Sequence, residues 1–171
     1  MCWFLTAAVP LKLEATLRQK AHAAGLETTQ QENASIAAAL RSVDRLPAQL
    51  RLWAVTRGGC SCDLIITPVA DRRLRGPERR KRMAELQGAG IGLRADAREL
   101  LASLVDTGQQ PVAFLMHTYG GTLDETFDVT KGPRVTPEEM RRDDARCRPD
   151  AIFVIRAIPR YRREREPVPQ T

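Results

Sequence analysis

Three short apolar segments, each stopped by proline or glycine, constrain the fold more than any other feature of this sequence. Trp3–Val9 and Ala151–Ile158 both run into a proline, and Pro111–Tyr119 runs into a pair of glycines. Apolar runs of this length with turn residues at their ends are typical of strands that are buried on both faces. The sequence therefore predicts a sheet with a buried centre.

Helices are predicted between these strands. Leu11–Ala24 carries apolar residues every three or four positions and ends at a glycine, and Arg94–Val105 has one apolar face. A third helix is predicted from Pro77 to about Gln87. Thr136-Pro137-Glu138-Glu139 is a capping box, so a short helix is predicted to begin there. Glu27–Leu40 stays ambiguous, because it fits either a polar strand or loop followed by a short helix.

Two hairpins are predicted from glycine pairs. Leu50–Thr56 would pair with Cys62–Thr67 across Gly58-Gly59, and Pro111–Tyr119 would pair with Thr126–Thr130. The resulting fold class is α+β, a single domain over residues 1–158 with a mixed sheet of about five to seven strands and three to four helices. Residues 159–171 are charged and rich in proline, so a flexible tail is expected.

Composition narrows the class of protein. The chain has 171 residues, with 27 Lys+Arg against 21 Asp+Glu, a net charge of +6. No segment has the roughly 20 apolar residues of a membrane-spanning helix, and the first residues lack the pattern of a signal peptide, so a cytoplasmic location is expected. Four cysteines are too few and too unevenly spaced for a disulfide framework, so free thiols are expected.

The segment Gly58-Gly59-Cys60-Ser61-Cys62 is the sharpest chemical motif. Residues two apart in a strand point to the same face, so both thiols would emerge together. Thiolates favour soft metal ions, and a structural zinc site needs about four ligands. Cys2 at the start of the first strand and His117 near the end of the third apolar run complete a predicted Cys₃His zinc site, with a structural or sensory role.

Three segments together carry a resemblance. They are Met1–Leu5, the corner Thr56–Cys62, and His117–Asp124. In combination they resemble segments of small bacterial proteins that have no known activity. The resemblance covers about a third of the chain, and it implies only that the three segments form one site.

Other roles for the same residues stay open. Cys60 or Cys62 could pair with His117 in a hydrolase, with Asp63 or Asp124 orienting the imidazole, or the two cysteines could form a thiol–disulfide redox pair. If Met1 were removed, Cys2 would offer a thiol beside a free amine, as in N-terminal-nucleophile amidohydrolases.

Simple packing of the cysteines in the core, and a hydrogen-bonded structural role for His117, remain the plainest interpretations. Cys147 is expected to lie apart from the other thiols, and His22 is expected to face solvent.

A basic segment forms the second constellation. Its seven cations within about a dozen positions are Arg72, Arg73, Arg75, Arg79, Arg80, Lys81 and Arg82. Such a cluster could follow a phosphate backbone or bind an acidic protein. The segment contains no aromatic residue for base stacking, and its arginines spread around the predicted helix, which also suits a solvated surface.

Overall fold

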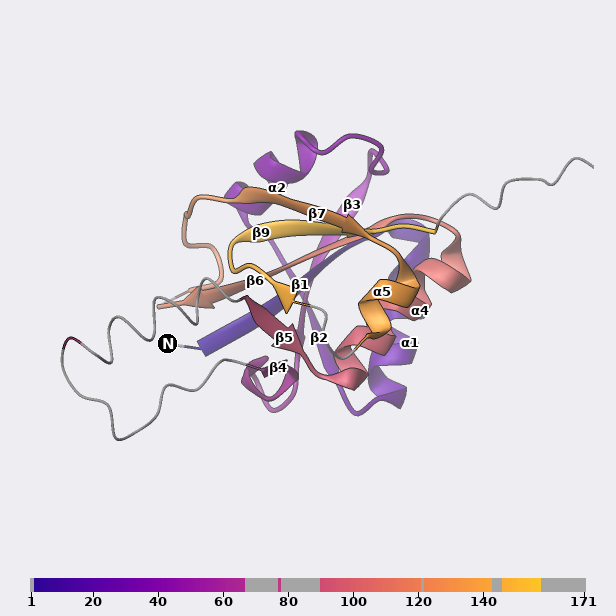
Figure 1. The fold of residues 1–171 in the computed structure, drawn as a ribbon, viewed down its shortest axis with the longest axis horizontal. Coiled ribbons are helices and arrows are strands. Elements are labelled where there is room, and N and C mark those ends of the chain that lie inside the picture. Colours follow the sequence, from indigo (N-terminus) through magenta and orange to yellow (C-terminus); the bar gives the residue numbers. More distant parts are fainter. Residues whose placement is uncertain (1, 67–76, 78–89, 121, 143–145, 158–171) are drawn as a thin grey trace, which may run out of the picture.

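The three apolar runs lie in the middle of a six-stranded sheet with the order β2-β3-β1-β6-β9-β7. The computed structural model describes residues 2–66, 77, 90–120, 122–142 and 146–157 (Figure 1). The apolar runs form β1 (Cys2–Pro10), β6 (Val112–Tyr119) and β9 (Ala151–Ile155). Each of them has a strand on both sides, which explains why most of their residues are buried.

Shorter strands complete two sheets. The larger sheet also contains β2 (Glu27–Gln31), β3 (Leu50–Thr56) and β7 (Thr130–Val135). Its strands pair antiparallel except β7 and β9, which are parallel, so the predicted mixed sheet is confirmed. A small antiparallel sheet has the order β4 (Ile65–Ile66), β5 (Ile91–Leu93) and β8 (Arg146–Cys147).

The described part of the chain contains four α-helices, which confirms the α+β class. They are α1 (Glu14–Ala23), α2 (Ala34–Arg41), α4 (Ala95–Gly108) and α5 (Pro137–Arg141). The side chain of Asn33 accepts a hydrogen bond from the N–H of Ile36, which starts α2 and resolves the ambiguous segment into β2 followed by a helix. The predicted capping box of Thr136 and Glu139 is present at the start of α5.

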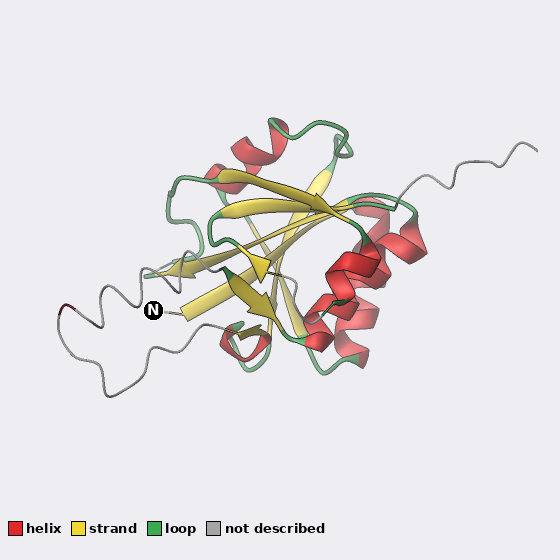
Figure 2. Cartoon of the chain, in the orientation of Figure 1, coloured by secondary structure: helices red, strands yellow, loops and turns green. Residues whose placement is uncertain are grey.

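The helices divide between the two faces of the larger sheet. One face packs against α1, α4, α5 and the small sheet, around buried residues such as Leu17, Leu101 and Phe114. The other face packs against α2 and the segment after β6, around Ile36 and Leu115. Figure 1 shows α1, α4 and α5 gathered on one side with α2 on the other, and Figure 2 shows the strands between them.

The first predicted hairpin is wrong in its second strand. A tight turn does follow β3 at the predicted glycines, but Cys62–Leu64 forms a 3₁₀ turn, η2, and Ile65–Ile66 pairs with β5 in the small sheet. The reason is that β1 and β2 already occupy both edges of β3, so the chain beyond the turn finds no free edge there.

The second predicted hairpin is also wrong. β6 pairs with β1 and β9, and the strand expected at Thr126–Thr130 begins only at Thr130, where β7 runs parallel to β9. The helix predicted over Pro77–Gln87 lies outside the described residues, apart from Pro77, and so does the tail 159–171. No helix in the described ranges is long and apolar enough to cross a membrane.

Candidate metal centre

The turn after β3 depends on its two glycines. Arg57 and Cys60 bridge across it, and the N–H of Arg57 donates to the carbonyl of Cys60 at 2.8 Å. Gly58 and Gly59 have φ angles of +63° and +88°, the pair of left-handed conformations that a tight two-residue hairpin loop requires. Glycine adopts them without steric penalty, so the chain reverses at once and Cys60 returns toward β1.

Ser61 fixes this turn to the sheet. Its backbone N–H donates to the carbonyl of Trp3 at 2.9 Å, and its hydroxyl accepts a hydrogen bond from the N–H of Leu5 at 2.8 Å. The same hydroxyl donates to the carbonyl of Val55, and the side chain is fully buried. One serine therefore joins β1 and β3 at the point where their ladder ends.

Three thiols converge beside this serine. The sulfur atoms of Cys2, Cys60 and Cys62 all lie within 4.8 Å of one another. Cys2 and Cys62 are exposed and Cys60 is partly exposed, and the N–H of Trp3 donates to the Cys62 sulfur at 3.4 Å. Zinc bound at about 2.3 Å from each sulfur would hold the sulfurs roughly 3.8 Å apart, so closure needs movements of about 1 Å or less.

The local geometry of the Cys-x-Cys motif differs from the prediction. The two cysteines do not alternate along a strand, because Ser61 has φ −99° and ψ 13° and Cys62 begins the 3₁₀ turn. Instead, Ser61 turns its hydroxyl into the sheet while the flanking thiols stay at the surface. The convergence of Cys2 with Cys60 and Cys62 agrees with the predicted cluster and depends on the same turn glycines.

The structure does not bring His117 into this group. His117 lies opposite Phe4 on β1, and its Nδ1 lies 2.5 Å from an Asp150 carboxylate oxygen. Its Nε2 lies 3.4 Å from a carboxylate oxygen of Glu125. The ring stacks on Phe127 with centroids 3.6 Å apart, and only 7% of the residue is exposed. The carboxylates that orient the imidazole are therefore not the predicted Asp63 or Asp124.

His117 belongs to a polar layer that sequence reasoning missed. On the sheet, Gln31 donates to the hydroxyl of Thr6 at 2.6 Å, and both residues are buried. The amide of Asn33 donates to the carbonyls of Leu123 and Glu125, which ties the segment after β6 to the start of α2. Isolated polar residues in loops and strand ends carry no periodic signal, so only the fold identifies this layer.

Tyr119 closes this layer near the end of β6. Its ring meets His117 edge-on at 4.5 Å and Phe4 at 5.4 Å. Burial raises the pKa of Tyr119 to about 12, with a smaller contribution from the carboxylates of Glu125 and Asp150, while the Thr6 hydroxyl acts in the opposite direction. The phenol therefore stays protonated at neutral pH.

The remaining candidates lie apart. Cys147 sits in β8 opposite Ile91, and burial raises the pKa of its thiol to about 12, so it is an inert packing cysteine at neutral pH. This separation from the other thiols agrees with the prediction. His22 is exposed on α1, as expected. The seven basic residues from Arg72 to Arg82 lie outside the described residues, and nucleic-acid or acidic-partner binding stays a prediction.

Comparison with models of known protein families, with curated proteins and with solved structures finds no match to this chain. The geometry of the thiol cluster therefore carries the functional argument alone.

Proposed function

We propose that Cys2, Cys60 and Cys62 bind one soft metal ion, with zinc as the expected ion. The observation that carries this proposal is the convergence of three thiols, from two segments far apart in the sequence, within 4.8 Å. Thiolates are preferred ligands of zinc and copper(I), and bringing three of them together without a cation is opposed by their mutual repulsion.

The coordination chemistry suggests an exchangeable site. Among the described His, Cys, Asp and Glu residues, no fourth side chain joins the three thiols. Structural zinc sites are closed by four protein ligands, whereas sites with three keep one position for water or another small ligand. A sensory role, in which metal occupancy reports on metal supply, fits this arrangement better than a purely structural one.

His117 stays a predicted fourth ligand. To bind the ion it would have to leave Asp150 and Glu125 and give up its stack on Phe127. The proposal does not require that rearrangement, and the two versions of the site can be separated by substitution of His117.

Elemental analysis tests the proposal directly. The protein purified without added metal is expected to contain one equivalent of zinc, and a double substitution Cys60→Ser with Cys62→Ser is expected to lose it. Cys147→Ser is the matched control, since Cys147 lies in β8 away from the cluster. Wild-type protein without stoichiometric zinc, copper or iron, and without uptake of added zinc, would remove the metal proposal.

The exposure of the same thiols favours one second candidate, a thiol redox centre. Hydrogen peroxide would convert two thiols to a disulfide, forming one S–S bond and two waters, and a third thiol nearby could then attack that disulfide. Mass spectrometry after peroxide and alkylation tests this candidate. A specific disulfide among Cys2, Cys60 and Cys62 supports it, and equal, slow modification of all four cysteines argues against it.

A further inference from the structure

A separate cavity lies on the opposite face of the sheet from the polar layer. It has a volume of about 230 Å³ and lies between α5, β8 and the sheet. Its floor contains the stacked rings of Phe114 and Phe153, whose centroids are 5.3 Å apart, and Met140 and Val135 add apolar surface. The proposed metal centre contributes no residue to this cavity.

Rigid elements hold the walls of the cavity in place. The capping box fixes the start of α5, and the buried Arg98 of α4 donates to the carbonyl of Arg142 at 2.9 Å, which fixes its end. On the other side, β8 pairs with β5, and Gly90 packs so closely that an added Cβ would lie 3.2 Å from Arg146 Cβ. The cavity is therefore formed before any ligand arrives, which lowers the entropic cost of binding.

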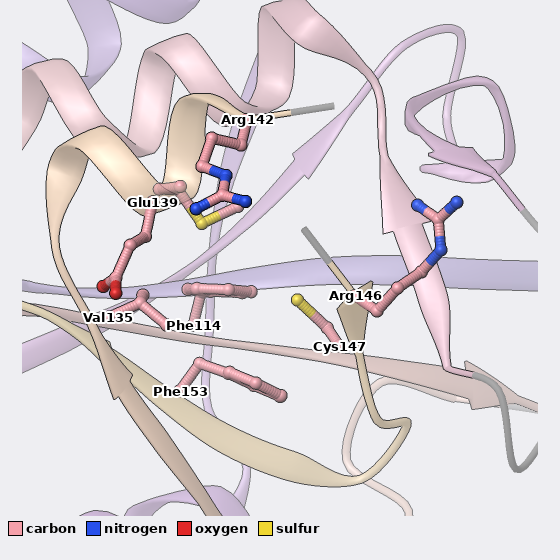
Figure 3. Close-up of a pocket in the computed structure, with 8 residues that line it drawn as sticks. Phe114, Val135, Glu139, Arg142, Arg146, Cys147 and Phe153 are labelled. Atoms are coloured by element: carbon pink, nitrogen blue, oxygen red, sulfur yellow. The ribbon is translucent and has the colours of Figure 1, made fainter. Parts of the chain in front are cut away.

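The polar groups around the cavity are unequal. Figure 3 shows the Arg142 side chain above Phe114 and the Cys147 sulfur directed toward that ring. The Arg146 guanidinium points away, and its Nη1 lies 2.9 Å from where a Cβ on Gly92 would be. Hydrogen bonds with Thr136 hold the pKa of Glu139 below its usual range, so this carboxylate is ionised and already engaged in the capping box.

We propose that this cavity binds a small carboxylate with a six-membered aromatic ring or a branched aliphatic body of similar size. The ring would lie on Phe114 and Phe153, and the carboxylate would face Arg142. A guanidinium has several N–H donors, so Arg142 can keep its existing contacts and still donate to a ligand. A cavity of about 150 Å³ accommodates benzene, so 230 Å³ leaves room for a ring and one charged group.

The size also excludes larger ligands. Pockets for drug-sized molecules and nucleotides occupy about 300–1,000 Å³, which exceeds this volume. The cavity offers one facing cation, which suits a monocarboxylate better than a phosphate ester carrying two negative charges.

A nuclear magnetic resonance titration with benzoate tests this assignment. In the isotope-labelled full chain, saturable shifts are expected at Met140, Cys147 and Phe153. Benzamide, which has the same shape and no charge, is expected to bind at least about tenfold more weakly, because the charge-assisted hydrogen bond is lost. Equal binding of benzoate and benzamide would overturn the carboxylate assignment, and absence of saturation in the millimolar range would overturn the site.

Two substitutions locate the ligand. Arg142→Met is expected to weaken benzoate binding by about tenfold or more while leaving benzamide binding unchanged. Arg148→Met is the matched control, since Arg148 is exposed and does not line the cavity. If both variants weaken benzoate equally, the effect is one of general surface charge and the proposal fails. Because Arg142 is on the surface, the variant is expected to fold, and a thermal melt confirms this.

Discussion

The hydroxyl of Ser61 accepts a hydrogen bond from the N–H of Leu5, 56 positions earlier in the sequence, at 2.8 Å. The same hydroxyl donates to Val55, so this one buried side chain satisfies polar groups of two neighbouring strands. Cys60 and Cys62 flank it directly, and Cys2 lies three residues before Leu5 on β1. The geometry of the thiol cluster therefore depends on a residue that offers no ligand.

Substitution of Ser61 by alanine is expected to damage both stability and metal binding. The N–H of Leu5 would be left buried without a partner, which costs about 1–3 kcal/mol of the free energy of unfolding. Loss of the link between the turn and the strands would also let the thiols separate, so zinc affinity is expected to fall by about 10–100-fold, as for other groups that orient metal ligands. Urea unfolding of the metal-free protein and competitive zinc titration measure the two effects.

Ser42→Ala is the matched control for this prediction. The Ser42 hydroxyl donates to the carbonyl of Ala39 at an exposed site, so its removal is expected to change the free energy of unfolding by about 0.5 kcal/mol or less. An equal effect of the two serine substitutions would show that Ser61 has no special role.

Alanine at Gly59 is expected to destabilise the turn. An added Cβ would meet no atom within 4 Å, so the cost comes from the φ of +88° and not from crowding. The left-handed conformation costs a residue with a Cβ about 1–2 kcal/mol. Gly120→Ala is the control, because Gly120 follows β6 without a positive φ and its nearest contact is 4.0 Å away. Thermal unfolding should show a clear loss for Gly59→Ala only, and an equal loss in both variants would contradict the explanation.

Removal of the His117 side chain distinguishes the two versions of the metal site. His117→Ala is expected to retain one equivalent of zinc, since the imidazole faces Asp150 and Glu125. It is expected to lose about 1–3 kcal/mol of stability, because the stack on Phe127 disappears and two carboxylates lose their partner. His22→Ala, on an exposed helix face, should change neither quantity. Loss of zinc in His117→Ala alone would instead establish His117 as a ligand.

The strands could be predicted where burial leaves a continuous apolar run. β1, β6 and β9 were visible because each is buried on both faces and ends at a proline, a glycine or a charged residue. The pairing partners were not visible, because a glycine pair marks a turn without showing which strand follows it. β5 was missed because a strand of only three residues, Ile91–Leu93, has no detectable period.

The site could be predicted in part for a related reason. Cys2 and the Cys-x-Cys corner converge because β1 and β3 are neighbours, which strand patterns suggest. His117 lies on the adjacent strand, but it faces Phe4, and its carboxylate partners come from irregular segments. Asp150 has a φ of +56° in the turn before β9, and no sequence periodicity marks such a position.

Alkaline pH is expected to destabilise the fold through Tyr119 and Cys147. Burial raises the pKa of Tyr119 from 10.0 to about 12 and that of Cys147 from 9.0 to about 12. In the unfolded chain these groups lose their protons at lower pH, so the unfolded state binds fewer protons between about pH 9 and pH 12. The free energy of unfolding must then fall as pH rises through this window.

Tyr119→Phe isolates the phenol's share of this effect. The variant keeps the ring contacts with Phe4 and His117 but has no group that titrates between pH 10 and pH 12 at this position. Urea unfolding in steps across the window is expected to show a shallower decline in the variant than in the wild type. Parallel curves for the two proteins would mean that burial of Tyr119 does not contribute to the pH dependence, and that other ionisable groups cause the decline.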